Sequence, residues 1–158
     1  MRAGFGYDAH RLAPGRPLVL GGVAIPFDRG LIGHSDADAA THAVIDAVLG
    51  AAAAGDCGSH FPASDPRFAG ARSTDLLADA ARVVRAAGFS IVNVDCTIVA
   101  QAPPLASHVP AMRAALAAAA GIALDQVSVK AKSPEGLGFA GTGEGIEAFA
   151  TAMLEATT

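Results

Sequence analysis

Three residues have the types and the spacing of a metal site. Asp8 and His10 lie two residues apart at the end of a short predicted strand, and His42 follows in an alanine-rich segment. Residues two apart on a strand project from the same face, so the Asp8 and His10 side chains can reach one common atom. Two imidazoles and one carboxylate are suitable ligands for zinc and leave a position for water or substrate. The pattern predicts a zinc site with Lewis-acid chemistry; for each histidine alone, the alternative is a hydrogen-bonded structural role.

The residues around His42 predict a helix start and partners for its imidazole. Ser35 and Asp38 have the spacing of a capping box, which predicts a helix over about 36–54. Asp38 and Asp46 each lie four residues from His42, so either carboxylate could hold the ring nitrogen that does not face the metal. Helix capping and a solvated helix face are the alternatives for these two carboxylates, and Asp38 fits them better than Asp46.

The composition predicts one domain that gains buried area by association. The chain has 158 residues, of which 52% are hydrophobic and only 5% aromatic. Alanine and glycine pack closely but contribute less hydrophobic area per residue than leucine or phenylalanine. Contact with further copies of the chain could supply the remaining area. A formal net charge of -4 gives no electrostatic footprint for nucleic acid.

The same composition predicts a cytoplasmic protein. No apolar run reaches the length needed to span a membrane, and the first five residues lead directly into a strand, so we expect no signal peptide. Cys57 and Cys96 form neither a Cys-x-x-Cys motif nor a disulfide framework, and we expect both to be reduced thiols.

Hydrophobic patterning alternates strands and helices along the chain and predicts an α+β fold. We expect a hairpin over 16–26 turning at Gly21-Gly22, a helix beginning with Ser73 as its cap and stopped by Gly88, and a helix over 109–120 ended by Gly121. Residues 56–70 predict a long functional loop. The remaining predictions are strands over 89–101 and about 127–132, with one face of the first formed by Val92, Val94, Cys96 and Ile98, and a segment over 144–156 whose alternation fits a strand and whose propensities fit a helix.

Five motifs follow one another along nearly the whole chain. They are Gly6-Tyr7-Asp8-Ala9-His10, Gly33-His34-Ser35-Asp36-Ala37-Asp38 with His42, Phe61-Pro62-Ala63-Ser64-Asp65-Pro66, Ala100-Gln101-Ala102-Pro103, and Gly136-Leu137-Gly138-Phe139 through Gly143-Glu144-Gly145. Each is modest alone, but together they resemble the 2-C-methyl-D-erythritol 2,4-cyclodiphosphate synthase family of the non-mevalonate isoprenoid pathway. The resemblance implies that residues 1–158 form a single catalytic domain, a mixed β-sheet packed against helices, which assembles as a homotrimer.

The implied reaction needs metal ions at the subunit interfaces. The 2-phosphate of 4-diphosphocytidyl-2-C-methyl-D-erythritol 2-phosphate would attack the β-phosphorus of the same molecule, giving the cyclic diphosphate and CMP. The resemblance makes Asp8, His10 and His42 the zinc ligands. It makes Glu135 the ligand of a second cation, Mg²⁺ or Mn²⁺, that bridges the α- and β-phosphates, because hard cations prefer carboxylate and phosphate oxygens.

The resemblance also assigns catalytic and binding residues. His34 and Ser133 would be catalytic, with Ser133 steadying charge in the transition state and His34, together with Ser35, hydrogen-bonding phosphate. Asp56 to Gly58 would meet the ribose or sugar alcohol in a neighbouring subunit's site, and the backbone of Ala100 to Ala106 would hold the cytosine. The full substrate-binding set is Asp8, His10, His34, Ser35, Asp56, Cys57, Gly58, Phe61, Pro62, Ala63, Ser64, Asp65, Ala100, Gln101, Ala102, Pro103, Pro104, Leu105, Ala106, Lys132, Ser133, Pro134, Glu135, Phe139 and Thr142.

Several positions depart from the family's common pattern. Thr142 stands where an arginine is usual near substrate phosphate, which leaves open whether the central cavity holds a ligand. Lys132 and Pro134 replace smaller polar residues; Lys132 could supply the missing cation, with a solvated strand lysine as the simpler alternative. Cys57 replaces a β-branched aliphatic residue, and Phe139 has a core position as its alternative role.

Two functions from other classes stay open at this point. A zinc phosphohydrolase would place water in the open metal position and release phosphate rather than CMP. A non-catalytic trimer would bind isoprenoid diphosphates in its axial cavity without zinc. Release of CMP from the CDP-linked substrate, with and without a zinc chelator, distinguishes these possibilities.

Overall fold

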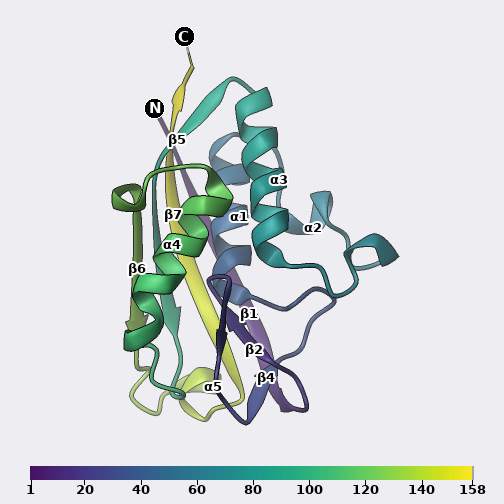
Figure 1. The fold of residues 1–158 in the computed structure, drawn as a ribbon, viewed down its shortest axis with the longest axis vertical. Helices are drawn as coiled ribbons and strands as arrows, with labels where there is room; N and C mark the ends of the chain where they lie inside the picture. Colours follow the sequence, from purple (N-terminus) through teal and green to yellow (C-terminus); the bar gives the residue numbers. More distant parts are fainter. Residues whose placement is uncertain (158) are drawn as a thin grey trace.

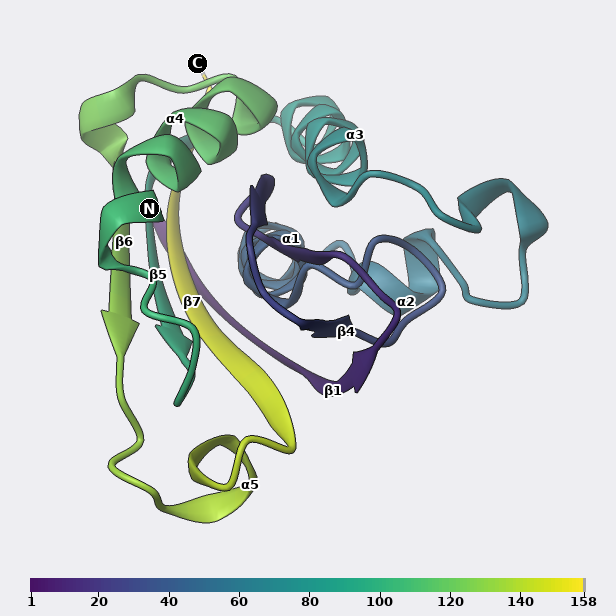
Figure 2. The same cartoon turned by 60° about the horizontal axis from the view of Figure 1, so that its bottom comes forward.

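The backbone forms a mixed five-stranded sheet with its long helices on one face (Figures 1 and 2). A computed structural model describes residues 1–157 of the chain. The strands are β1 (Arg2–Pro14), β2 (Leu18–Leu20), β3 (Val23–Ile25), β4 (Arg29–Leu31), β5 (Phe89–Val99), β6 (Val127–Lys132) and β7 (Gly145–Ala156). The α-helices are α1 (Ala39–Ala51), α2 (Cys57–His60), α3 (Ser73–Ala86), α4 (Val109–Ala120) and α5 (Gly138–Gly141).

The order of the strands in the main sheet is β4-β1-β7-β5-β6. All neighbours are antiparallel except β5 and β6, which are parallel and therefore need a crossover connection, provided by α4. The strand β7 is central, and its alternating residues from Ile146 to Leu154 are buried beneath the helices. Hydrogen bonds to a strand on each side explain why the 144–156 segment is a strand despite its helical propensities.

Helix α1 lies unusually close to β1 because two glycines face it. A Cβ atom on Gly6 would stand 1.9 Å from the carbonyl oxygen of Ala43, and one on Gly4 would stand 2.0 Å from that of Ala47. Glycine in a strand often marks such an approach of another backbone. The contacts also fix the direction of the helix: as β1 advances from Gly4 to Gly6, α1 recedes by one turn, from Ala47 to Ala43.

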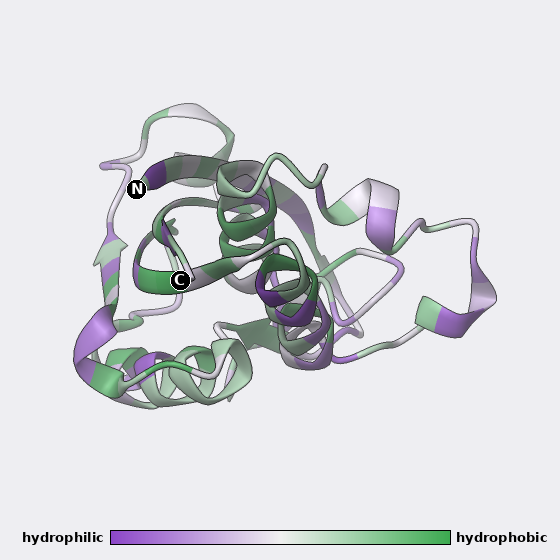
Figure 3. Cartoon of the chain, turned by 90° about the horizontal axis from the view of Figure 1, so that it is seen from above, coloured by the Kyte–Doolittle hydropathy of each residue, from purple (hydrophilic) through white to green (hydrophobic). Residues whose placement is uncertain are grey.

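Helix α1 is buried on nearly every side. Within it, only His42, Asp46 and Gly50 are not buried, and these three are spaced four residues apart. Residues four apart lie one above the other on a helix, so the helix has a single accessible stripe. Two members of that stripe are polar, and both face the cavity described below. Figure 3 shows hydrophobic and hydrophilic turns on the helices and many hydrophilic residues in the loops around them.

Several predicted boundaries need correction. The helix predicted over 36–54 spans Ala39–Ala51, because Asp38 is itself the N-cap and accepts a hydrogen bond from the Thr41 N–H at 3.0 Å. Ser35 therefore belongs to no capping box. Strand β1 does not end near His10 but continues to Pro14, where it pairs with β4. Ser73 is the first residue of α3 and its side chain makes no capping hydrogen bond, since Arg72 occupies the cap position.

Other predictions from the pattern are confirmed or changed in detail. The hairpin over 16–26 is formed by β2 and β3, with positive φ angles at Gly21 and Gly22 in its turn. In β5 the pairing register shifts between Ile91 and Asn93, so Ile91 is buried and Val92 is only partly buried. The 56–70 loop contains α2 and a short 3-10 turn, Pro66–Phe68.

The sheet face opposite the helices exposes aromatic side chains. Phe5 is 63% exposed and Tyr7 is 44% exposed, and both rings lie near Phe149, with centroid distances of 6.4 and 5.1 Å. These residues alternate with the helix-facing Gly4, Gly6 and Asp8 along the strands. Among residues 1–157, no helix is long and apolar enough to cross a membrane.

The close approach of α1 to β1 gives a first prediction. Gly6→Ala should destabilise the fold by about 1–3 kcal/mol or more, because a backbone carbonyl cannot move aside as a flexible side chain can. Gly50→Ala in α1 is the control on the helix side of this contact, where only the Phe5 carbonyl lies as near as 4.0 Å to an added Cβ. It should be neutral or stabilise by about 0.5–1 kcal/mol. Urea unfolding of both variants measures the difference, and equal stabilities would refute the steric argument.

Candidate functional site

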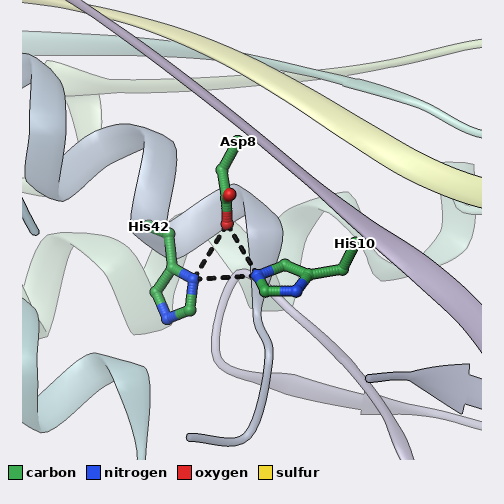
Figure 4. A group of neighbouring side chains, drawn as sticks. All are labelled: Asp8, His10 and His42. Carbon is green, nitrogen blue, oxygen red and sulfur yellow. Dashed lines mark hydrogen bonds and ion pairs between the residues drawn. The ribbon is translucent and has the colours of Figure 1, made fainter. Parts of the chain in front are cut away.

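Three side chains from β1 and α1 meet at one point (Figure 4). The Oδ2 atom of Asp8 lies 2.8 Å from Nε2 of His10 and 2.9 Å from Nδ1 of His42, and the two ring nitrogens are 3.3 Å apart. Among the described residues, this is a group whose ligand atoms are close enough to hold one metal ion. The prediction that Asp8 and His10 share a face is confirmed, and the direction of α1 brings His42 to the same point.

The outer nitrogen of each imidazole is hydrogen-bonded to the protein. Nδ1 of His10 lies 2.7 Å from the carbonyl oxygen of Ile32, which can only accept, so Nδ1 carries the proton and Nε2 presents its lone pair inward. The outer Nε2 of His42 lies 2.8 Å from the Ser73 hydroxyl and 3.2 Å from that of Ser35. Inward lone pairs beside a carboxylate repel one another unless a cation lies among them, so the donor set fits a divalent metal.

The pKa shifts of Asp8 and His10 arise from these short contacts between the three side chains. Burial alone would raise the pKa of Asp8, but hydrogen bonds from His10 and His42 and their charge outweigh it and hold the pKa well below its usual range. Burial would lower the pKa of His10, yet the hydrogen bond and charge of Asp8 outweigh it and raise that pKa. Protons and a metal therefore compete for the same inward nitrogen.

The three residues form part of the wall of a cavity of about 330 Å³. Its lining residues come from β1, the accessible stripe of α1, the loop before α1, and the segment from α2 to α3. Its lining consists of Asp8, His10, His34, Ser35, His42, Asp46, Asp56, Cys57, Gly58, Phe61, Ala63, Phe68 and Leu76. Most of these were predicted; Asp46 was expected only as a partner of His42, while Phe68 and Leu76 were not anticipated.

Asp46 connects α1 to the segment that carries the predicted sugar-binding residues. Its Oδ1 accepts a hydrogen bond from the Cys57 N–H at 2.7 Å. Asp56 caps α2 and accepts from the Ser59 N–H at 2.7 Å, and these hydrogen bonds hold its pKa below the usual value. Asp56 lines the same cavity as His42 within one chain, whereas we expected it to serve a neighbour's site.

Neither predicted carboxylate holds the outer nitrogen of His42. Asp46 is engaged with Cys57, and Asp38 is fully buried, where it accepts from the backbone N–H groups of Gly21 at 2.8 Å and Gly22 at 2.6 Å. Both carboxylates lie four residues from His42 in the sequence, but neither hydrogen-bonds to its outer nitrogen. Backbone N–H groups that lie closer occupy them instead. The partners of His42 are instead the hydroxyls of Ser35 and Ser73.

The thiol of Cys57 is not a nucleophile in this cavity. Burial raises the pKa of Cys57 to about 12, and the nearby carboxylates of Asp46, Asp8 and Asp56 act in the same direction. The thiol is therefore neutral near pH 7, and only the thiolate is strongly nucleophilic. Cys57 therefore forms part of the cavity wall as a small, neutral side chain.

The predicted loop over Phe61 to Asp65 enters the cavity only in part. Phe61 and Ala63 line it, whereas Pro62, Ser64 and Asp65 do not. The Asp65 carboxylate pairs with Arg67, and its carbonyl oxygen lies 3.0 Å from Nε2 of His34. His34 is thereby tied to the loop that borders the cavity.

The predicted cytosine-binding turn forms a second cavity of about 300 Å³. It lies at the ends of β5 and β6, and β7 separates these strands from β1. The two cavities share no lining residue. The second is lined by Ala100, Gln101, Pro103, Pro104, Leu105, Ala106, Ala131, Lys132 and Ser133.

Besides Pro62, Ser64 and Asp65, five further predicted site residues line neither cavity of the single chain: Ala102, Pro134, Glu135, Phe139 and Thr142. Glu135 is exposed with φ of 54°, and its N–H donates to the Ser133 hydroxyl at 3.1 Å. Thr142 donates to Glu144 Oε1 at 2.9 Å, which gives this position a partner of its own within the chain. Phe139 is 41% exposed and so is not a core aromatic residue.

Fold and site together define an α+β protein with a divalent-metal group in an open cavity. The YgbB family model matches residues 1–155. A 2-C-methyl-D-erythritol 2,4-cyclodiphosphate synthase of Burkholderia thailandensis is 61% identical over 153 residues, covering 97% of this chain and 94% of that protein. The chain therefore belongs to the YgbB family, whose matching members are named as these synthases.

Solved structures agree over nearly the full length. A 2C-methyl-D-erythritol-2,4-cyclodiphosphate synthase in its CDP-bound form has a TM-score of 0.89 and 38% identity, covering 98% of this chain and all of that one (100%). The bifunctional IspDF of Campylobacter jejuni has a TM-score of 0.94 and 38% identity, covering 98% of this chain. This chain spans 42% of that longer one.

The metal group gives a second prediction. The purified chain should bind about one zinc ion tightly, since three protein ligands form a site of this kind, and His42→Ala should lose it. His108→Ala is the control, because His108 belongs to no metal-holding group among the described residues. Zinc affinity should fall as the pH drops through the raised pKa of His10, since protons compete for its Nε2. Full zinc content in His42→Ala would refute the assignment.

Proposed function

We infer that the chain cyclises 4-diphosphocytidyl-2-C-methyl-D-erythritol 2-phosphate to 2-C-methyl-D-erythritol 2,4-cyclodiphosphate and releases CMP. This is a step of isoprenoid precursor biosynthesis by the non-mevalonate pathway. The observation that carries the inference is the Asp8–His10–His42 group, set in a full-length match to synthases of this name. It makes the chain a metal-dependent phosphorus–oxygen lyase, acting in the cytoplasm.

The chemistry needs no nucleophile from the protein. An oxygen of the 2-phosphate forms a bond to the β-phosphorus, and the bond from that phosphorus to the oxygen of CMP breaks. Both reacting groups belong to one molecule, so the protein has to fold the substrate, bring the two phosphates together and screen their charges. The thiol of Cys57, which lines the metal cavity, is neutral near pH 7, and this is consistent with a reaction that uses no protein nucleophile.

Asp8, His10 and His42 would hold zinc, and Glu135 would hold Mg²⁺ or Mn²⁺. These cations would supply Lewis-acid stabilisation of the phosphate oxygens and of the departing CMP. His34 and Ser35 lie in the same cavity wall as the metal group and would orient the 2-phosphate by hydrogen bonds. Ser133 would donate to an oxygen that gains charge in the transition state.

The substrate's two ends suit the two cavities. The cavity beside the metal group would take the methylerythritol and its phosphates. The cavity formed by Ala100 to Ala106 with Lys132 and Ser133 would take the cytidine, using backbone groups of the turn for the base. A related synthase has been solved in a CDP-bound form, which supports a CDP-linked ligand for this chain.

One chain does not bring the two cavities together, so we propose that neighbouring chains of a homotrimer do. The β7 strand lies between the cavities within a chain. The exposed aromatic face of Phe5, Tyr7 and Phe149 offers apolar area for the association. Such an interface places the metal cavity of one subunit beside the cytidine cavity of the next.

The direct test is release of CMP from the CDP-linked substrate. We expect turnover by the zinc-loaded chain, loss of turnover after chelation, and recovery on adding zinc. Glu135→Gln should keep its zinc and lower the rate, with partial rescue at high Mg²⁺ by mass action, while Glu144→Gln serves as the exposed-carboxylate control. Release of inorganic phosphate without CMP would identify a phosphohydrolase instead and refute the proposal.

Mixing two inactive variants tests the shared site. His42→Ala damages the metal cavity and Ser133→Ala the cytidine cavity, so a 1:1 mixture should regain activity at about a quarter of all its interface sites, assuming random assembly with cyclic symmetry. His42→Ala mixed with Asp56→Ala is the control, because both residues line one cavity of one chain and no intact site can form. If both mixtures recover the same activity, or if neither recovers any in trimers shown to be mixed, the proposed sharing of sites between subunits is wrong.

A further inference from the structure

Two residues behind His42 form a hydrogen-bonded chain that ends at its outer nitrogen. The Ser73 hydroxyl lies 2.8 Å from His42 Nε2 and also contacts Asp36 Oδ1. Asp36 Oδ2 accepts from the Ser73 backbone N–H at 3.0 Å, and Asp36 Oδ1 accepts from the Asp38 N–H at 3.2 Å. The chain thus links the start of α3 to the loop before α1 and to the metal group.

The chemistry of the three groups fixes the direction of the hydrogen bonds. An ionised carboxylate can only accept, so the Ser73 hydroxyl gives its proton to Asp36. The oxygen of Ser73 then accepts from His42, which places the imidazole proton on Nε2. A neutral imidazole with its proton on Nε2 has a lone pair on Nδ1, the nitrogen that faces Asp8 and His10.

We propose that Ser73 and Asp36 are positioning residues that set the tautomer and the ring orientation of His42 for metal binding. The proposal rests on the metal site of the proposed function. Ser73 touches neither cavity and is 0% exposed, so it acts on the substrate only through His42. Partners of this kind behind a metal-binding histidine typically contribute about 10–100-fold to metal affinity or activity.

The second hydroxyl near His42 is a weaker candidate for this role. Ser35 Oγ lies 3.2 Å from Nε2 and also accepts from the Ala37 N–H at 3.2 Å. Among residues 1–157, no carboxylate hydrogen-bonds to the Ser35 hydroxyl to fix the direction of its proton, and Ser35 faces the cavity. Ser73 has both the shorter distance to His42 and the carboxylate partner that makes it an obligatory acceptor.

A structural role for the Ser73 hydroxyl can be separated from this one. The hydroxyl does not cap α3, and the hydrogen bond that ties the Ser73 backbone to Asp36 survives removal of the side-chain oxygen. Ser73→Ala therefore deletes the contact with His42 and keeps the anchor of the helix. Thr74→Ala, one residue further along the same first turn, is the matched control.

The test measures zinc affinity by competition with a chelator and the His42 tautomer by ¹⁵N NMR. We expect Ser73→Ala to bind zinc about 10-fold more weakly, with Ser35 retaining part of the interaction. The Nε2–H signal of His42 in the metal-free protein should shift toward a mixture of tautomers. Thr74→Ala should match the unaltered chain in both measurements. Unchanged zinc affinity and tautomer in a folded Ser73→Ala would overturn the proposal.

A second variant acts from the other end of the chain. In Asp36→Asn, the amide N–H₂ can only donate. If it faces the Ser73 hydroxyl, that hydroxyl has to accept from it and can then donate its own proton to His42. If it faces the Ser73 backbone N–H, two donors meet and no hydrogen bond forms. Zinc affinity should fall at least as far as in Ser73→Ala, and an unchanged value in the folded variant counts against the proposal. If the unaltered chain binds no zinc, the metal site itself fails; if it binds zinc and both variants match it, only the positioning role fails.

Discussion

The contact between two backbones, α1 against β1, determines where the chemistry of this protein takes place. Gly4 and Gly6 allow the carbonyl oxygens of α1 to lie where a Cβ atom would otherwise stand. Asp8 is the next residue of β1 on that face, and His42, which directly precedes Ala43 in α1, lies opposite it. The position of the metal group is thus set by the way α1 packs along β1. Backbone atoms in contact cannot move aside as flexible side chains can, so this position is tightly fixed.

The metal group depends on proton positions as much as on distances. The carbonyl oxygen of Ile32 directs the proton of His10 outward, and the hydroxyl of Ser73 is arranged to do the same for His42. The carboxylate of Asp8 then faces two lone pairs, and a cation relieves their repulsion. In the function that we propose, metal binding is therefore prepared by hydrogen bonds outside the cavity, made by residues that do not line it.

The division of the substrate site follows from the topology. The central position of β7 keeps the cavity beside Asp8, His10 and His42 on the β1 side of the sheet and the predicted cytosine-binding turn at the ends of β5 and β6. A substrate with a cytidine at one end and a phosphorylated sugar alcohol at the other fits this separation once two copies meet. The exposed aromatic face of the sheet offers apolar area for the association that we propose.

The sequence by itself determined the α+β class, the hairpin at Gly21-Gly22, the ligand group Asp8–His10–His42 and the family, because periodicity, turn chemistry and motif order are local signals. Only the tertiary structure decided that His42 is held by Ser73, 31 residues away, that Asp38 and Asp46 are engaged by backbone donors, and that Asp56 shares the cavity of His42. Each of these depends on which donor comes nearest to which acceptor once α1, α3 and the loop at Cys57 are packed. Spacing along the chain cannot predict which donor binds which acceptor, because that outcome depends on distances between segments that are remote in sequence.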